Sequence, residues 1–109
     1  MFKISDHQTF TRTVTIRVPA DGGYIDETLA VTYKVLPTTE TNSYDLASEK
    51  GARAFLTAAI EKLDDITDKK GDPVPYSDAL RDKVLDLPYV RTPLAEEYLK
   101  SVTGAAEGN

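Results

Sequence analysis

The sequence contains no cysteine and no tryptophan, and His7 is its single histidine. Without cysteine the chain cannot form a disulfide framework, a thiolate zinc site or a cysteine nucleophile. A lone histidine near a chain end is more often a surface residue than a general base. These absences exclude most of the common catalytic and metal-binding arrangements.

Positive charge is also scarce. The 109 residues include 13 Lys and Arg against 18 Asp and Glu, which gives a formal net charge of −5 at pH 7. Proteins that bind the phosphate backbone usually carry the opposite balance, so we predict no nucleic-acid partner. The chain has no apolar run of about 18 residues, and its opening segment, MFKISDHQTF, lacks the features of a signal peptide. We therefore expect a soluble, intracellular protein without a membrane span.

Two segments alternate between apolar and polar residues with the period of a half-buried strand. The apolar positions are Val14, Ile16 and Val18 in the first segment and Leu29, Val31, Tyr33 and Val35 in the second. Asp21, Gly22 and Gly23 lie between the segments and tolerate positive φ. We predict an antiparallel β-hairpin over residues 11–36 with a rather long loop. A third strand is expected from Phe2 to Ile4 or near Val74.

Helical periodicity predicts three helices, at about residues 45–64, 78–87 and 92–103. The apolar stripe of the first helix includes Leu56, Ile60 and Leu63. The predicted N-caps are Ser43 or Asp45 for the first helix, Ser77 for the second and Thr92 for the third, with Pro93 at the first helical position. Residues 104–109 are expected to form a disordered tail. The sequence thus predicts one α+β domain over residues 1–109, a hairpin packed on three C-terminal helices.

The connector between the first two helices, ITDKKGDPVPYS, is rich in charge and proline. Its acidic residues raise the question of calcium binding, but lysines occupy the middle and the closing glutamate of a calcium loop is absent. We interpret it as a structural connector in which a glycine permits the turn, prolines keep the chain extended, Val74 and Tyr76 insert into the core, and Ser77 starts a helix. Its residues are Gly71, Pro73, Val74, Pro75, Tyr76 and Ser77. No metal or cofactor is predicted.

No catalytic motif stands out. Ser77 has no nucleophile elbow around it, so we predict a non-enzymatic protein, with an unrecognised pair of catalytic carboxylates as the weaker alternative. Apolar and aromatic residues near the C-terminal helices are typical anchors of protein interfaces, although each one alone is also typical of a core. The predicted partner-binding residues are Leu87, Tyr89, Val90 and Tyr98.

The order of these features resembles the small tail assembly chaperones of long-tailed bacteriophages and prophages. The residues that carry the resemblance are Gly71, Pro73, Val74, Pro75, Tyr76, Ser77, Leu80, Leu85, Pro88, Val90, Leu94 and Tyr98. The resemblance implies a chaperone that binds the tape-measure and tail-tube proteins in the host bacterial cytoplasm and is absent from the mature virion. Self-association stays open. The alternative is a structural subunit of the tail, such as a terminator or a head-tail connector.

Overall fold

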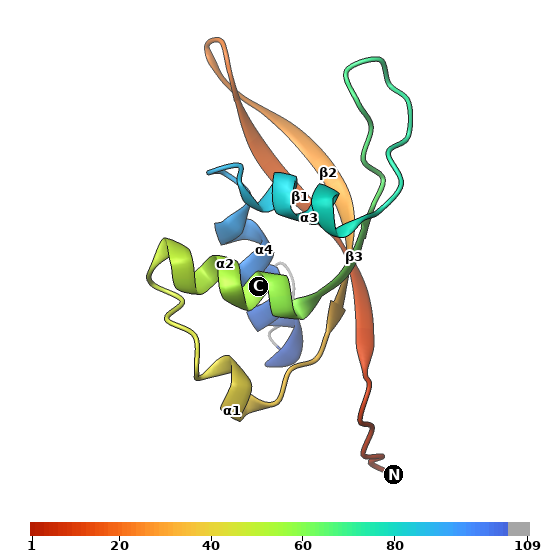
Figure 1. Cartoon of the computed structure of the whole chain (residues 1–109), viewed down its shortest axis with the longest axis vertical. Coiled ribbons are helices and arrows are strands. Elements are labelled where there is room, and N and C mark those ends of the chain that lie inside the picture. Colours follow the sequence, from red (N-terminus) through yellow and green to blue (C-terminus); the bar gives the residue numbers. More distant parts are fainter. Residues whose placement is uncertain (105–109) are drawn as a thin grey trace.

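The structure is a computed structural model that describes residues 1–104 (Figure 1). Its elements are β1 (Thr9–Ala20), β2 (Gly23–Lys34), α1 (Thr38–Thr41), α2 (Glu49–Ala59), β3 (Ile60–Asp64), α3 (Asp78–Leu85) and α4 (Arg91–Val102). The strands form one antiparallel sheet in the order β1-β2-β3. The helices gather on one side of this sheet, which confirms the predicted α+β class (Figure 1).

The hairpin of β1 and β2 has the predicted alternation. Its register pairs Val14 with Leu29, and the inward side chains in the half of the hairpin nearer the helices, such as Val14, Leu29 and Val31, are buried. Val35, predicted to point inward with them, lies after the end of β2 and is exposed. The turn is shorter than predicted, because Ala20 pairs with Gly23 and leaves only two residues between the strands. Gly22 makes this turn with a φ of 80°, a conformation that glycine adopts at little cost. The hairpin is therefore a tight one.

The third strand is not where the sequence suggested. β3 follows α2 directly and pairs with β2. The predictions of a third strand from Phe2 to Ile4 or near Val74 are wrong. Residues 1–8 lie outside the sheet, and the chain near Val74 forms only an isolated bridge between Thr67 and Pro73.

Helix α2 is shorter than predicted at both ends. It begins after Ser48, whose hydroxyl accepts a 2.9 Å hydrogen bond from the Gly51 amide, so neither Ser43 nor Asp45 is the cap. It ends at Ala59, and the remainder of the predicted helix is β3. The short helix α1 was not predicted.

The last two helices lie close to their predicted positions. Ser77 caps α3 as predicted, with its hydroxyl accepting a 3.0 Å hydrogen bond from the Leu80 amide. The N-cap of α4 is Val90, so the prediction of Thr92 as cap is wrong and Pro93 occupies the third helical position. Proline is tolerated there because the first amides of a helix have no intrahelical acceptor. The predicted tail, apart from Gly104, lies outside the described residues.

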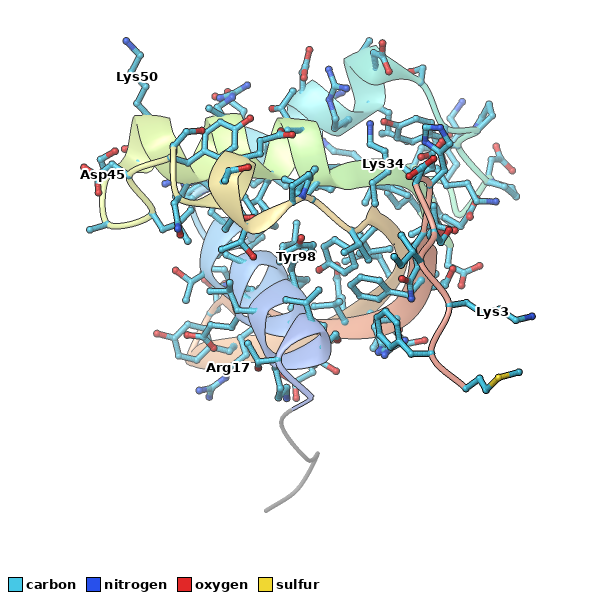
Figure 2. All side chains as sticks on the ribbon, turned by 90° about the horizontal axis from the view of Figure 1, so that it is seen from below. Lys3, Arg17, Lys34, Asp45, Lys50 and Tyr98 are labelled. Atoms are coloured by element: carbon cyan, nitrogen blue, oxygen red, sulfur yellow. The ribbon has the colours of Figure 1, made fainter. Side chains whose placement is uncertain are left out.

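Aromatic side chains connect the sheet to the helices. The rings of Phe10 and Tyr33 stack at 5.1 Å between centroids, and Tyr98 of α4 meets Tyr33 at 5.5 Å and Phe55 of α2 at 5.0 Å. Figure 2 shows Tyr98 directed into the space between α4 and the sheet. None of the helices described in residues 1–104 has both the length and the apolar character that a membrane crossing requires.

A candidate protein-binding groove

An apolar groove lies between the sheet and α3. We call it the α3 groove, and its volume is about 450 Å³. Its lining residues are Ile16, Val18, Glu27, Thr28, Leu29, Asp65, Ile66, Thr67, Val84, Leu87, Tyr89 and Val90. Concave sites of this size, lined mainly by apolar side chains with a few polar groups, are typical of binding sites.

The groove exists because the hairpin is longer than the helical layer that covers it. In β2 every residue from Gly23 to Thr28 is exposed, whereas Leu29 and Val31 are buried. Helix α3 has only 8 residues, and its Val84 lines the groove together with Ile16 and Leu29, near the boundary between these two halves. The distal half of the hairpin projects beyond the helices (Figure 1). Apolar side chains at this boundary, such as Val18, stay only half-buried.

The connector forms the opposite wall. After β3 the chain turns at Asp65, which has a φ of 61°, and runs outward before it returns. The amide of Val74 donates a 2.8 Å hydrogen bond to the carbonyl oxygen of Ile66, so this loop is an irregular hairpin. It stands beside the β1–β2 hairpin, on the same end of the molecule (Figure 1). Ile66, which the sequence did not single out, is thereby placed in the groove.

The acidic tip of the connector has a structural explanation. The Asp68 carboxylate accepts hydrogen bonds from the amides of Lys70, at 2.8 Å, and Asp72, at 3.0 Å. Gly71 completes the reversal with a φ of 85°. Residues 1–104 contain no group of three or more His, Cys, Asp or Glu side chains that could hold a metal ion. Asp68 therefore acts as a turn former, as aspartate often does.

The rest of the predicted connector is less deeply inserted than expected. Tyr76 packs against the core but remains half-buried, and Val74 is also half-buried. Pro73 and Pro75 are exposed and hold the chain extended between them. The prediction that Val74 and Tyr76 both insert into the core is thus wrong in its extent, because the hairpin-like loop keeps this segment at the surface.

Three of the four predicted partner-binding residues line the α3 groove, and the fourth, Tyr98, does not. Leu87, with 38% of its surface exposed, and the half-buried Tyr89 line the α3 groove. Val90 and Tyr98 are only 3% and 1% exposed. Val90 nevertheless lines the groove with its small exposed surface. Tyr98 lies inside the aromatic core, so the prediction that it binds a partner is wrong. Interface and core aromatics look alike in a sequence.

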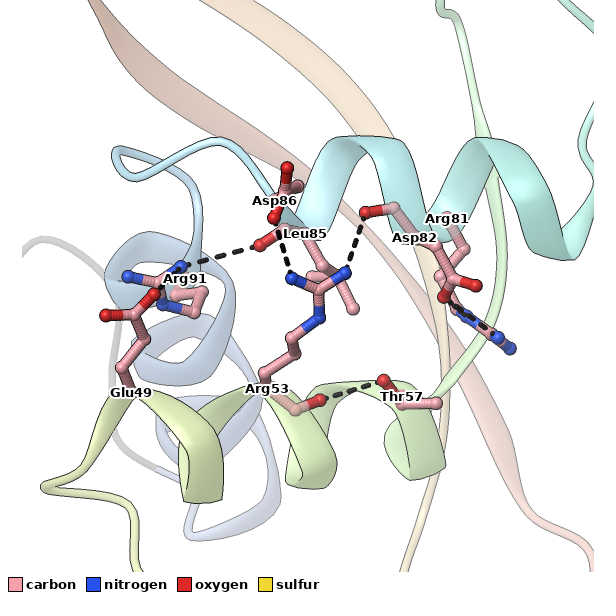
Figure 3. A network of polar contacts seen from close by, with 8 residues as sticks. All are labelled: Glu49, Arg53, Thr57, Arg81, Asp82, Leu85, Asp86 and Arg91. Carbon is pink, nitrogen blue, oxygen red and sulfur yellow. Dashed lines mark hydrogen bonds and ion pairs between the residues drawn. The ribbon is translucent and has the colours of Figure 1, made fainter.

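A polar network holds the helical wall of the groove in place. Arg53 of α2 donates to the Asp86 carboxylate at 2.9 Å and to the Asp82 carbonyl oxygen at 3.2 Å (Figure 3). Arg91 of α4 reaches the Leu85 carbonyl oxygen at 3.5 Å and Glu49 at 3.6 Å. Both arginines thus converge on the C-terminal end of α3 (Figure 3). This end leads directly into Leu87.

The charged residues on the rim of the groove are acidic. Glu27 and Asp65 both line it and are exposed. Neither makes an ion pair within the part of the chain that the structure describes. A ligand that combines apolar side chains with a positive charge would complement this arrangement.

Comparisons with known proteins complete the description of the chain. No family model matches it, and no curated protein and no solved structure gives a match.

Proposed function

We propose that this chain is a non-enzymatic tail assembly chaperone of a long-tailed bacteriophage or prophage. In this role it binds the tape-measure protein and the tail-tube protein during virion morphogenesis, in the cytoplasm of the host bacterium. It leaves before the virion is mature. The proposal is supported by the resemblance of the segment from Gly71 to Tyr98 and by the α3 groove, which lies beside that segment.

The α3 groove is the observation that carries the proposal. It offers apolar side chains that are accessible without any rearrangement, Leu87 above all. Exposed apolar surface of this kind marks interaction sites in soluble proteins. A groove of about 450 Å³ supports only a small interface, and small interfaces belong to the weak and transient class. A chaperone that must release its client needs an interface of that class.

The acidic rim adds selectivity. Glu27 and Asp65 favour client segments in which apolar residues are flanked by lysine or arginine, and they disfavour acidic segments. We therefore expect binding to weaken as the salt concentration rises.

The test is to follow the chain through tail assembly. The gene is expressed with its neighbours, and purified particles and assembly intermediates are analysed by quantitative mass spectrometry. The proposal predicts the chain in complexes with the tape-measure protein and its absence from finished particles. Several copies in each finished particle would contradict the proposal and favour the alternative, a structural tail terminator or head-tail connector subunit.

A further inference from the structure

The N-terminal arm, residues 1–8, exposes large apolar side chains. Phe2 and Ile4 are 94% and 90% exposed, and Lys3 lies between them. In an extended chain Phe2 and Ile4 point to one side and Lys3 to the other. Figure 2 shows the arm leaving the body of the molecule, with Lys3 directed away from it. Burial of two such exposed apolar side chains against a partner is favourable in free energy, because it removes apolar surface from water.

The α3 groove has the properties that such an arm requires. It provides apolar walls for two side chains, and its rim carries Glu27 and Asp65 for the lysine. Lys3 makes no ion pair within residues 1–104. The arm and the groove are thus complementary both in apolar character and in charge.

The arm does not reach the groove of its own chain. It joins β1 at Thr9, whereas Ile16 and Val18 mark the groove further along the same strand. Residues 9 to 16 of a strand span about 23 Å, at about 3.3 Å per residue. The arm also continues away from the hairpin, at the end of the molecule opposite to the groove (Figure 1). To bring Phe2 to its own groove, the arm would have to fold back fully extended along β1, whereas it runs the other way (Figure 1). With the arm in this course, the groove that it meets belongs to another molecule.

We propose that the N-terminal arm of one copy binds the α3 groove of a second copy. Phe2 and Ile4 enter the groove. Lys3 points out of it, and its long side chain bends back to the exposed carboxylates of Glu27 and Asp65 on the rim. The arm and the α3 groove lie at opposite ends of the molecule. The contact is therefore head-to-tail, unless two copies exchange their arms reciprocally. The inference concerns the chain alone and does not depend on the tail-assembly proposal. It also implies that the arm competes with any client for the groove.

Sedimentation velocity over a range of concentrations tests the self-association. The wild-type chain is expected to form species larger than the monomer as its concentration increases. The double variant Phe2→Ser and Ile4→Ser should remain monomeric with an unchanged melting temperature, because both side chains are exposed in the single chain. The matched control is Val35→Ser, an exposed apolar residue outside the groove, which should associate like the wild type. A wild-type chain that stays monomeric at millimolar concentration would overturn the proposal.

A peptide identifies the site. The peptide MFKISDHQ is titrated into the isotope-labelled double variant, and amide shifts are followed by NMR. The amide resonances that move should be those of residues at the α3 groove. The control peptide MSKSSDHQ should move none of them. Leu87→Lys should weaken binding at least about tenfold, as expected for the loss of an interface anchor.

A charge exchange between the groove and the peptide distinguishes specific binding from non-specific hydrophobic association. The Glu27→Lys variant should bind the wild-type peptide more weakly than the unchanged groove does. A peptide that carries Lys3→Glu should bind this variant with the lost affinity restored. Binding that is insensitive both to Leu87→Lys and to the charge exchange would show that the arm docks elsewhere, and the proposal would then be wrong.

Discussion

The hydroxyl group of Tyr33, in the central strand β2, donates a 2.8 Å hydrogen bond to the carbonyl oxygen of Leu94 in α4. A second bond runs nearby, from the Leu36 amide to the Tyr98 hydroxyl at 2.9 Å. The two tyrosines, whose rings lie edge to face, thus fasten the last helix to the middle of the sheet. Helix α4 in turn supports the end of α3 through Arg91, so this pair stabilises the wall of the groove indirectly.

Replacing Tyr33 by phenylalanine should lower the free energy of unfolding by about 1 to 2 kcal/mol, the cost of a lost buried hydrogen bond. The ring packing is retained, so the fold should persist. Urea denaturation followed by circular dichroism gives the difference. A loss near zero would mean that the bond to Leu94 contributes nothing in solution.

The same residue predicts a pH dependence. Burial, with a smaller contribution from Glu97, raises the pKa of Tyr33 above the ordinary tyrosine value. The unfolded chain therefore loses this proton first, and the stabilisation that is present below about pH 10 decreases as the pH rises further. The slope for one such group reaches about 1.4 kcal/mol per pH unit. The Tyr33→Phe variant should show a smaller decrease between pH 10 and 11 than the wild type.

Gly51 makes a close approach that the sequence did not reveal. A β-carbon at this position in α2 would collide with the backbone carbonyl group of Asp45. Gly51→Ala should therefore destabilise the chain by about 1 to 3 kcal/mol, although alanine is the better helix former. Lys50→Ala, an exposed substitution in the same helical turn, is the control and should change stability by less than about 0.5 kcal/mol. A stabilised Gly51→Ala variant would contradict the packing at this site.

Substitution of Asp68 tests whether the connector has a structural role and no metal-binding role. Asp68→Ala removes the acceptor of two amide hydrogen bonds and should cost about 0.5 to 2 kcal/mol, like the loss of a helix cap. Asp68→Asn keeps an oxygen acceptor and should cost less. Thermal melts with and without millimolar calcium should coincide for the wild type. A melting temperature that rises with calcium would mean that the loop binds the metal after all.

Tyr76 is a weaker anchor than its sequence context suggested. Because the ring is half-buried, Tyr76→Ala should cost about 1 to 2 kcal/mol rather than the 3 to 5 kcal/mol of a fully buried aromatic residue. Tyr76→Leu, which keeps much of the apolar surface, should cost less than the alanine variant. Equal losses for the two substitutions would show that packing of this side chain is not what matters.

The sequence predicts the fold correctly where a residue pattern is typical of only one kind of secondary structure. The alternation around Val14 and Val31 fixed the hairpin, and Ser77 marked the start of α3. The predicted first helix extends too far, into the residues of β3, because β3 carries a bulge. Tyr33 pairs with Ile60 and Thr32 with Lys62, which leaves Glu61 without a partner. The bulge directs both Ile60 and Leu63 into the core, and their spacing of three residues then imitates a helix.

The site was only partly predictable for a different reason. Leu87 and Tyr98 are both large side chains near the C-terminus, and local sequence contains nothing that separates an accessible residue from a buried one. Their difference arises from tertiary structure, since Tyr98 faces Tyr33 across the core whereas Leu87 follows the last turn of α3. Ile66 enters the groove only because the connector folds back on itself.

The most direct test of the central claim, that the α3 groove binds the tape-measure protein, is a quantitative co-purification of the two proteins with two matched variants. Leu87→Asp places a charge in the groove, and Val35→Asp places one at an equally exposed position outside it, since the two residues are 38% and 37% exposed. The account predicts that Leu87→Asp reduces recovery of the tape-measure protein at least about tenfold while Val35→Asp retains it. Equal recovery with both variants would show that the groove is not the binding site.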